Sequence, residues 1–316
     1  MCLFAITSSV PFGVFMGILK SAPSVPVIFP PPGHVGSYSV KDGDDWFNVA
    51  SREAGRSDPW DLIEFNFATR DPREVNWYLE SYLNCTESTD GKNYSFSTGA
   101  GEIYLPPADW DPSIERSLRL IVLGALSNRA TKAINFQRGS HRVSTRELMV
   151  VGNAIIDGKI RVLQSSSIRS GRAVYDSDRN VIELGRSAGR TNKSKALIVH
   201  ECVHALFDLR QDTMTVGVSE GLAYVAQSIF MVQHTDDPED RLHVDIPSGG
   251  PGGATPQEIR NAIRRDAVFQ QAWKIALMIV DRKSVPASDW NLLDTAISLH
   301  PSYSSSAAHN AIFDGV

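Results

Sequence analysis

Hydrophobic and polar positions along residues 38–107 follow a pattern that predicts a strand, two helices and a closing strand. The segment 46–54 carries its apolar residues at helical spacing, and a glycine, a common residue just past a helix end, follows it. Asp58 and Pro59 have the character of an N-cap and a first helical residue, so a second helix begins here. Residues 102–107 read as a strand that ends at prolines. The pattern therefore predicts a small βααβ module.

Longer helical periods dominate residues 108–316. Apolar stripes and cap residues predict helices over 113–134, after the N-cap Ser144, from the N-cap Ser194 to about Arg210, from Val218, over 255–280 and around 292–297. Short apolar runs predict strands at 159–163, 173–175 and 181–184. The glycine-rich stretch 248–254 lacks the Lys-Ser/Thr pair of a phosphate loop, and we expect a mobile loop. The chain is thus expected to be α+β, with a mainly helical second domain that contains a small sheet.

Residues 1–19 are strongly apolar and carry no charged side chain. A signal peptide would place basic residues before its apolar run, but the first basic residue here is Lys20. With no clear signal peptide, we expect any export to follow a non-classical route. Proline and glycines interrupt the run, which argues against a membrane span. We expect an arm that packs on the protein itself or a segment that docks elsewhere, and membrane contact stays open. Prolines between 23 and 32 predict an extended linker, so residues 1–37 are assigned as arm and linker.

Composition narrows the classes of function. The 31 basic and 36 acidic side chains give a net charge of −5, which argues against nucleic acid as a partner. Residues 1–107 hold 7 basic and 13 acidic side chains, a net of −6, which leaves +1 for residues 108–316 and favours two units of different kind. The three cysteines, at positions 2, 85 and 202, have no metal-ligand or CxxC spacing. They are expected to be free thiols, with Cys2–Cys85 as the one pairing left open.

Four short motifs in the first unit resemble those of a LysM domain. They are Tyr38-x-Val40-x-x-Gly43-Asp44, the helix end Ala50…Gly55, Leu62-Ile63-x-x-Asn66, and Ile103-Tyr104-Leu105-Pro106. The resemblance implies a module, over residues 38–107, that binds N-acetylglucosamine glycans, with cell-wall glycan or a secretion apparatus as partner. The chain departs from the family between Phe67 and Gly101, in an insert that carries Trp77, Tyr78, Tyr82, Cys85, Tyr94 and Phe96. This insert is expected either to add core or to form a face for sugars or proteins.

The helix predicted over 195–210 is apolar nearly all round and should be buried. It nevertheless carries His200, Glu201 and His204, which need partners in such a place. The two histidines are four residues apart on one face, with Cβ atoms about 5–6 Å apart, a span that suits one tetrahedral ion. Glu201 lies beside them, within reach of a metal-bound water. The His-Glu-x-x-His motif on a helix therefore predicts a zinc site with Glu201 as general base.

A catalytic zinc site takes three protein ligands. Metzincin spacing would place a glycine at position 207 and a histidine at position 210, where this chain has Phe207 and Arg210. Glu220 begins another apolar helix sixteen residues after His204, and two antiparallel helices with a short connection would bring it over the histidine pair. Alone, Glu220 would be read as a charge that stabilises a helix N-terminus. Together with the pair, it is expected to complete the ligands of one Zn²⁺.

The His200-Glu201-x-x-His204 helix and the stretch Ser219-Glu220-Gly221-Leu222-Ala223 resemble a gluzincin zinc metallopeptidase over about residues 150–232. The resemblance implies a sheet whose edge strand binds extended substrate, with 173–175 or 181–184 as the candidate edge. Many gluzincins have an acidic residue four positions after the ligand glutamate, where this chain has Tyr224. The residue that orients a zinc histidine is then expected elsewhere, with Asp208 as the candidate.

Sites of this kind usually add a tyrosine or histidine that donates to the oxyanion of the transition state. Five residues could supply that donor, and the sequence does not choose among them: Tyr175, Tyr224, His243, His300 and Tyr303. Tyr224 could instead face the substrate.

The motifs together predict a zinc-dependent peptidase for protein or peptide substrates. Zn²⁺ would lower the pKa of its bound water, and Glu201 would take the proton and pass it to the leaving amine. A protease joined to a LysM-like module resembles bacterial secreted effectors or toxins. Two alternatives stay open: a peptidoglycan-directed peptidase, and a non-enzymatic glycan-binding or assembly protein with a structural zinc. An open fourth position at the metal would favour an enzyme, whereas a fourth protein ligand would favour a structural zinc.

Overall fold

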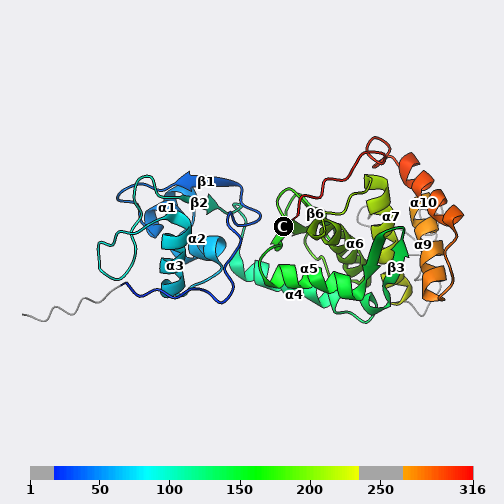
Figure 1. Ribbon diagram of the computed structural model, residues 1–316, viewed down its shortest axis with the longest axis horizontal. Helices are drawn as coiled ribbons and strands as arrows, with labels where there is room; N and C mark the ends of the chain where they lie inside the picture. The colour runs from blue at the N-terminus through cyan, green and yellow to red at the C-terminus, as the bar shows by residue number, and fades with distance from the viewer. Residues whose placement is uncertain (1–17, 235–265, 316) are drawn as a thin grey trace, which may run out of the picture. The chain divides into compact units, whose positions relative to one another are not determined.

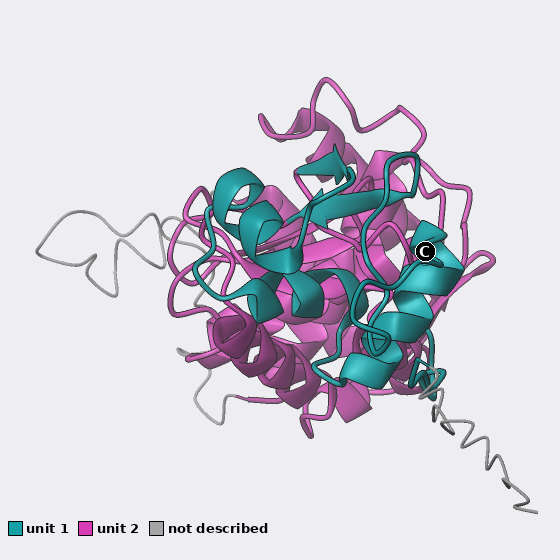
Figure 2. Ribbon diagram, turned by 90° about the vertical axis from the view of Figure 1, so that its left-hand side faces the viewer, with its two compact units in different colours: residues 1–26, 36–105 teal, residues 27–35, 106–316 magenta. Residues whose placement is uncertain are grey.

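The computed structural model describes residues 18–234 and 266–315 of the chain. These residues form two compact units, one with residues 18–26 and 36–105 and the other with residues 27–35, 106–234 and 266–315 (Figures 1 and 2). Both units mix helices with small sheets, so the fold is α+β as predicted. No helix in the described part of the chain is long and apolar enough to cross a membrane. His243, the glycine-rich stretch 248–254 and the predicted helix start at Thr255 lie outside the described residues.

The first unit pairs two short strands and places three helices between them in the sequence. Its elements are β1 (Gly36–Ser39), α1 (Trp46–Glu53), α2 (Pro59–Phe67), α3 (Pro72–Leu83) and β2 (Glu102–Leu105). The strands are antiparallel, with Tyr38 opposite Ile103. The two-helix prediction was wrong, because α3 begins inside the insert. Its start repeats the signal of α2: Asp71 is the N-cap, its side chain accepts from the Arg73 N–H, and a proline follows it.

The aromatic insert mainly adds core to the first unit. Tyr78 stacks on Phe67 with ring centroids 4.8 Å apart, and Tyr78, Cys85 and Phe96 are all buried. Burial of these side chains favours extra core over a face for stacking sugars. Cys85 and Cys202 are both free and buried, as expected for thiols in a core.

The segment predicted as arm and linker divides between the two units. At the middle of this segment, the Leu19 carbonyl oxygen accepts from the Asn76 Nδ2 in the first unit. Residues 27–35 belong to the second unit, where the Gly33 N–H donates to the Arg179 carbonyl oxygen at 3.1 Å. A Cβ atom at Gly33 would lie 2.9 Å from the Leu163 side chain, so glycine permits this close approach. Residues 27–35 are therefore part of a folded unit and not a free linker.

The second unit contains a two-stranded hairpin, a three-stranded sheet and several helices. Its elements are α4 (Pro112–Leu126), a 3-10 turn (Thr131–Ala133), β3 (Asn135–Arg138), β4 (His141–Ser144), α5 (Thr145–Ile156), β5 (Arg161–Gln164), β6 (Ala173–Asp176), β7 (Val181–Leu184), α6 (Asn192–Leu209), α7 (Val216–Val232), α9 (Ala267–Val280) and α10 (Ala287–Leu299). β3 and β4 form a hairpin, and β7 lies between β5 and β6 in a three-stranded sheet. Since β7 pairs on both sides, 181–184 was the wrong candidate for the edge, and 173–175 lies in the edge strand β6.

Two helices of the second unit begin or end at residues other than those predicted. The helix expected over 113–134 is α4, which ends at Leu126 because the chain turns there and enters the unpredicted β3–β4 hairpin. The helix expected after Ser194 begins earlier, with Thr191 as its N-cap. Ser194 occupies the third helical position and completes a capping box with Thr191, so both hydroxyls satisfy amides at this helix start.

Helices α6 and α7 form the centre of the second unit. α6 packs against α7, α5 and β6, and α7 packs against α9 and α10 (Figure 1). Cys202, Val203 and Phe207 of α6 have no exposed surface, nor have Leu222 and Phe230 of α7. Because both helices are buried on most sides, their rotation about their own axes is tightly restrained. That restraint positions the polar side chains that the two helices bring together.

A buried ion pair joins α4 to the sheet of the same unit. The Arg161 Nε donates to the Glu115 Oε1 at 2.9 Å, and the Trp110 Nε1 donates to the Glu115 Oε2 at 2.6 Å. Each side chain of the pair is 10% exposed. A buried pair with such geometry is costly to break, because the remaining charge has no partner.

Candidate metal centre

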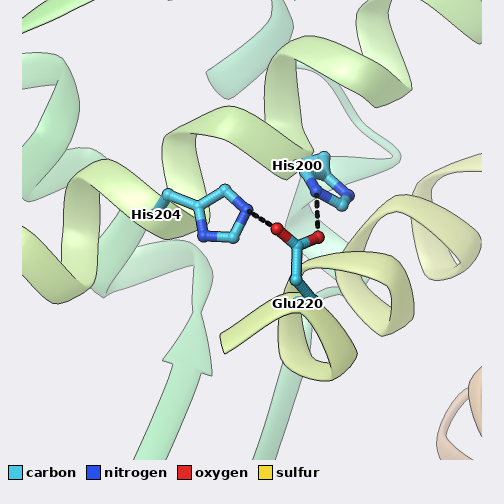
Figure 3. A group of neighbouring side chains, drawn as sticks. All are labelled: His200, His204 and Glu220. Carbon is cyan, nitrogen blue, oxygen red and sulfur yellow. Dashed lines mark ion pairs between the residues drawn. The ribbon is translucent and has the colours of Figure 1, made fainter. Parts of the chain in front are cut away.

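Helices α6 and α7 bring three predicted ligands together. His200 and His204 extend from α6 toward Glu220 at the start of α7 (Figure 3). The His200 Nε2 lies 3.4 Å from the Glu220 Oε2, and the His204 Nε2 lies 3.6 Å from the Glu220 Oε1. One ligand atom from each residue lies within 4.8 Å of the others. The three side chains therefore form a group that could hold a metal ion.

Two polar residues of α7 orient the histidine rings. The His200 Nδ1 lies 3.0 Å from the Gln227 Oε1, and the His204 Nδ1 lies 2.9 Å from the Ser219 Oγ. Because an amide oxygen only accepts, the His200 Nδ1 carries the hydrogen, and its Nε2 offers a lone pair to a metal. The prediction that Asp208 orients a histidine was wrong. A signal for Gln227 existed, since it follows Glu220 by seven residues, two turns along the same buried helix face.

Asp208 is bound to other groups. Its Oδ2 accepts from the Tyr175 hydroxyl at 2.6 Å, and its Oδ1 accepts from the Gly315 N–H at 3.1 Å. Burial and this carboxylate raise the pKa of Tyr175, so the hydroxyl stays protonated and donates. Tyr175 lines the cleft described below, but its hydroxyl is bound to Asp208, so its role as oxyanion donor stays an untested prediction.

The charges at the centre suit a cation. Burial would raise the pKa of Glu220, but the charges of His204 and His200 outweigh it and hold that pKa at about 2. Burial lowers the pKa of His204 to about 4, so its ring is neutral at pH 7 as a ligand must be. Burial also opposes the charged form of His200, but the carboxylates of Glu220 and Glu201 raise its pKa overall. The Glu220 Oε2 is buried and accepts no hydrogen bond from the described residues. A bound cation would satisfy this orphaned oxygen, so the three residues fit a metal.

Glu201 stands beside the ligand group. Its Oε2 accepts from the Tyr175 backbone N–H at 2.8 Å, which ties the carboxylate to the edge strand β6. Burial raises the pKa of Glu201 to about 7; the Glu220 charge adds to this rise, while the charge of His200 and the Tyr175 amide oppose it. The carboxylate is therefore both fixed in place and able to exchange a proton near neutral pH.

A cleft of about 540 Å³ opens onto the centre. Its walls come from β6 and the turn after it, from α6 and α7, and from the segment after α10. The residues that matter here are Val174, His200, Glu201, His204, Glu220, Tyr303, His309 and Ile312. His309 is a titratable cleft residue that the sequence pattern did not indicate, since it lies in a stretch without helical or strand periodicity.

Tyr303 and Tyr175 are the candidate donors, among the described residues, that line the cleft. The Tyr303 hydroxyl lies 3.1 Å from the Tyr224 hydroxyl, and the Tyr224 ring contacts His200 edge-on with centroids 4.8 Å apart. Burial and the Glu220 charge raise the pKa of Tyr303, which keeps it a donor at neutral pH. His300 accepts from the Ser302 N–H through its Nδ1 and packs beside the Tyr303 ring. Tyr224 therefore contacts the Tyr303 hydroxyl, and His300 packs against the Tyr303 ring.

No family model matches the chain, and neither the curated proteins nor the solved structures include a match to it. The function of the centre must therefore be inferred from its own geometry.

Proposed function

We propose that the protein is a zinc-dependent peptidase that hydrolyses peptide bonds with Glu201 as general base. The observation that carries this proposal is the three-residue ligand group His200, His204 and Glu220 at a cleft, with the Glu201 carboxylate held beside it. Catalytic zinc sites have three protein ligands and an open position, whereas structural sites have four protein ligands. Within the described part of the chain the ligand group has three members. This count favours an enzyme over a protein with a structural zinc.

The residues around the centre suit distinct steps of hydrolysis. His200, His204 and Glu220 would hold a Zn²⁺, which would supply an acidified water and polarise the scissile carbonyl. Glu201 takes the proton of the attacking water and returns it to the leaving amine nitrogen. The Tyr175 amide keeps the Glu201 carboxylate at the cleft during both transfers. Tyr303 donates its hydroxyl hydrogen to the developing oxyanion, and Tyr224 orients that hydroxyl.

The walls of the cleft suit an extended peptide. β6 is an edge strand of its sheet, and an edge strand can pair with a peptide through main-chain hydrogen bonds. Val174 is 42% exposed and Ile312 is 72% exposed, and both line the cleft. These two apolar side chains favour substrates with apolar side chains close to the scissile bond.

The first unit is proposed to deliver the peptidase to its target. The order β1, α1, α2, α3, β2 keeps the strand–helix–helix beginning and the closing strand of a LysM domain and adds α3. Its partner would be cell-wall glycan or a secretion apparatus, as in a bacterial secreted effector. A peptidoglycan-directed peptidase is the alternative that this module favours.

A cleavage assay with a matched variant tests the proposal. The zinc-loaded chain and its Glu201→Gln variant are incubated with an extended peptide library and, separately, with intact peptidoglycan. We expect the wild type to cleave library peptides and Glu201→Gln to lose at least about 10²-fold in kcat, with bound zinc unchanged by elemental analysis. Equal turnover by both proteins, or no cleavage of either substrate by the zinc-loaded wild type, would overturn the proposal. Cleavage of peptidoglycan alone would favour the peptidoglycan-directed alternative.

A further inference from the structure

Asp208 is a buried carboxylate that the proposed chemistry leaves unused. It lies on α6 one turn past His204 and has no exposed surface. Both of its oxygens accept a hydrogen bond, one from the Tyr175 hydroxyl and one from the Gly315 N–H. A buried carboxylate is costly unless its oxygens are satisfied, so these two bonds are a specific tie between distant parts of the chain.

Tyr175 bridges two points on the same helix. Its hydroxyl donates to Asp208, and its backbone N–H donates to the Glu201 Oε2 at 2.8 Å. Glu201 and Asp208 are seven residues apart on α6, two turns along one face and about 10 Å in rise. One residue of β6 is therefore fastened to α6 at both of its ends, by its side chain at Asp208 and by its main chain at Glu201.

Residues 309–315, here called the closing segment, complete this tie. The chain after α10 returns to end beside β6 (Figure 1). The segment begins at the start of α7, where the His309 carbonyl oxygen accepts from the Val216 N–H at 2.9 Å. It ends at Asp208, where the Gln211 Nε2 also donates to the Asp314 carbonyl oxygen at 2.7 Å. The closing segment thus satisfies a free amide of the helix that carries Glu220 and also reaches the carboxylate that holds β6.

We propose that Asp208 is a positioning residue for Glu201, acting through Tyr175, and that the closing segment locks this arrangement through Gly315. The inference rests on the proposed role of Glu201 as general base. Asp208 fixes the Tyr175 hydroxyl, the fixed side chain holds the Tyr175 amide against Glu201, and the amide keeps the carboxylate aimed at the cleft. The histidines are oriented by Gln227 and Ser219, so this tie controls the base and leaves the metal ligands alone.

Three variants break the tie at different points. Tyr175→Phe removes the hydroxyl, Asp208→Asn leaves one acceptor oxygen for two donors, and Gly315→Pro removes the amide hydrogen at a φ of +91° that proline cannot adopt. Two controls lose comparable groups elsewhere. Tyr94→Phe removes a hydroxyl that donates to Glu80 in the first unit, and Asp289→Asn alters a buried carboxylate that accepts from Lys274.

Hydrogen exchange measured by mass spectrometry on the zinc-loaded full chain tests directly whether these hydrogen bonds hold β6 against α6. We expect peptides that cover β6 to exchange at least about tenfold faster in the three variants, with zinc content unchanged and the two controls like wild type. We also expect kcat on a cleaved peptide to fall about 10- to 100-fold, the usual effect of losing a partner that orients an active-site group, with a smaller change in KM.

Each outcome decides a separate point. Unchanged exchange at β6 in Tyr175→Phe would overturn the tie, and this variant decides even if Asp208→Asn does not fold. Faster exchange with unchanged kcat would overturn the positioning role while leaving the proposed peptidase intact. If the wild type cleaves no peptide, the proposed function fails, and the exchange data still establish or refute the tie between β6 and α6.

Discussion

Zinc should stabilise the second unit through Glu220 and not through Glu201. Two substitutions of the same kind, Glu220→Gln and Glu201→Gln, change neighbouring carboxylates in one site. Glu220 offers a candidate ligand oxygen that is buried and accepts no hydrogen bond from the described residues, whereas Glu201 is held by the Tyr175 amide. The first substitution should therefore remove the zinc-dependent gain in stability, and the second should preserve it.

The size of the effect follows from the size of the unit, about 220 residues. A ligand at 100 times its Kd that binds only the folded state adds about 2.7 kcal/mol. In a domain of this size each kcal/mol moves the melting temperature by about 2–4 °C, so zinc should raise it by about 5–11 °C. If Glu220→Gln weakens binding by about 100-fold, the upper end of the loss seen when only a partner that orients a ligand is removed, the same zinc concentration adds only about 0.4 kcal/mol. The shift then falls to about 1–2 °C.

Differential scanning calorimetry on chelator-treated protein, dialysed and titrated with Zn²⁺, measures these shifts. Elemental analysis of the same samples gives the bound metal. A shift in Glu220→Gln as large as in wild type would refute Glu220 as a ligand. Loss of the shift in Glu201→Gln would refute the separation between ligand and base.

Three further outcomes test other parts of the structure. Tyr303→Phe should lower kcat about 10²-fold with zinc content unchanged, as expected for loss of one oxyanion donor. Steady-state kinetics with elemental analysis will check this, and an unchanged kcat would exclude Tyr303 as the oxyanion donor. Glu115→Gln should destabilise the second unit by about 3 kcal/mol because it leaves the buried Arg161 charge uncompensated, seen as a fall of about 6–12 °C in melting temperature. Asp111→Ala removes the N-cap of α4 and should cost about 1 kcal/mol in urea unfolding at pH 7. Because the Ser113 hydroxyl and helix amides hold the pKa of Asp111 below 3.8, the charge-dependent part of this stabilisation is complete above pH 3.8 and is lost as the pH falls through the lowered folded pKa. A gap between the two proteins that widens in acid would contradict that account.

Local signals in the sequence predicted much of the site. The apolar helix around His200 and His204 and the second apolar helix after Glu220 gave enough information to expect an antiparallel pair, and the structure brings the three side chains together. Caps were also readable: Asp58 before Pro59 predicted α2 correctly. The same Asp-Pro pair precedes α3 and α4. The sequence therefore contained a start signal for α3, the helix that the prediction omitted.

Other features depend on packing that a local pattern does not contain. Gln227 and Ser219 orient the histidines because the core sets the rotation of α7 about its axis. The β3–β4 hairpin has strands of four residues each, too short for a clear alternation of polar and apolar positions. The helix expected to 134 was too long because Ala130 and Ile134 are buried in the turn after α4 and continue the apolar spacing. The closing segment has no periodic pattern of apolar and polar residues. It is held mostly by main-chain hydrogen bonds, which leave no pattern of side chains in the sequence.

The candidate metal ligands and the proposed general base are supported by different parts of the chain. α7 carries the ligand Glu220 together with Gln227 and Ser219, the residues that orient both histidines, so the ligand geometry depends on how α6 and α7 pack. Glu201 depends instead on the Tyr175 amide of β6. Because the two supports share α6 but not their polar contacts, zinc binding and proton transfer should fail separately under mutation. A variant of Gln227 should lose metal while exchange at β6 stays slow, and a variant of Tyr175 should show the reverse; simultaneous loss of both in either variant would mean that α6 transmits every change, contrary to the independence of these contacts.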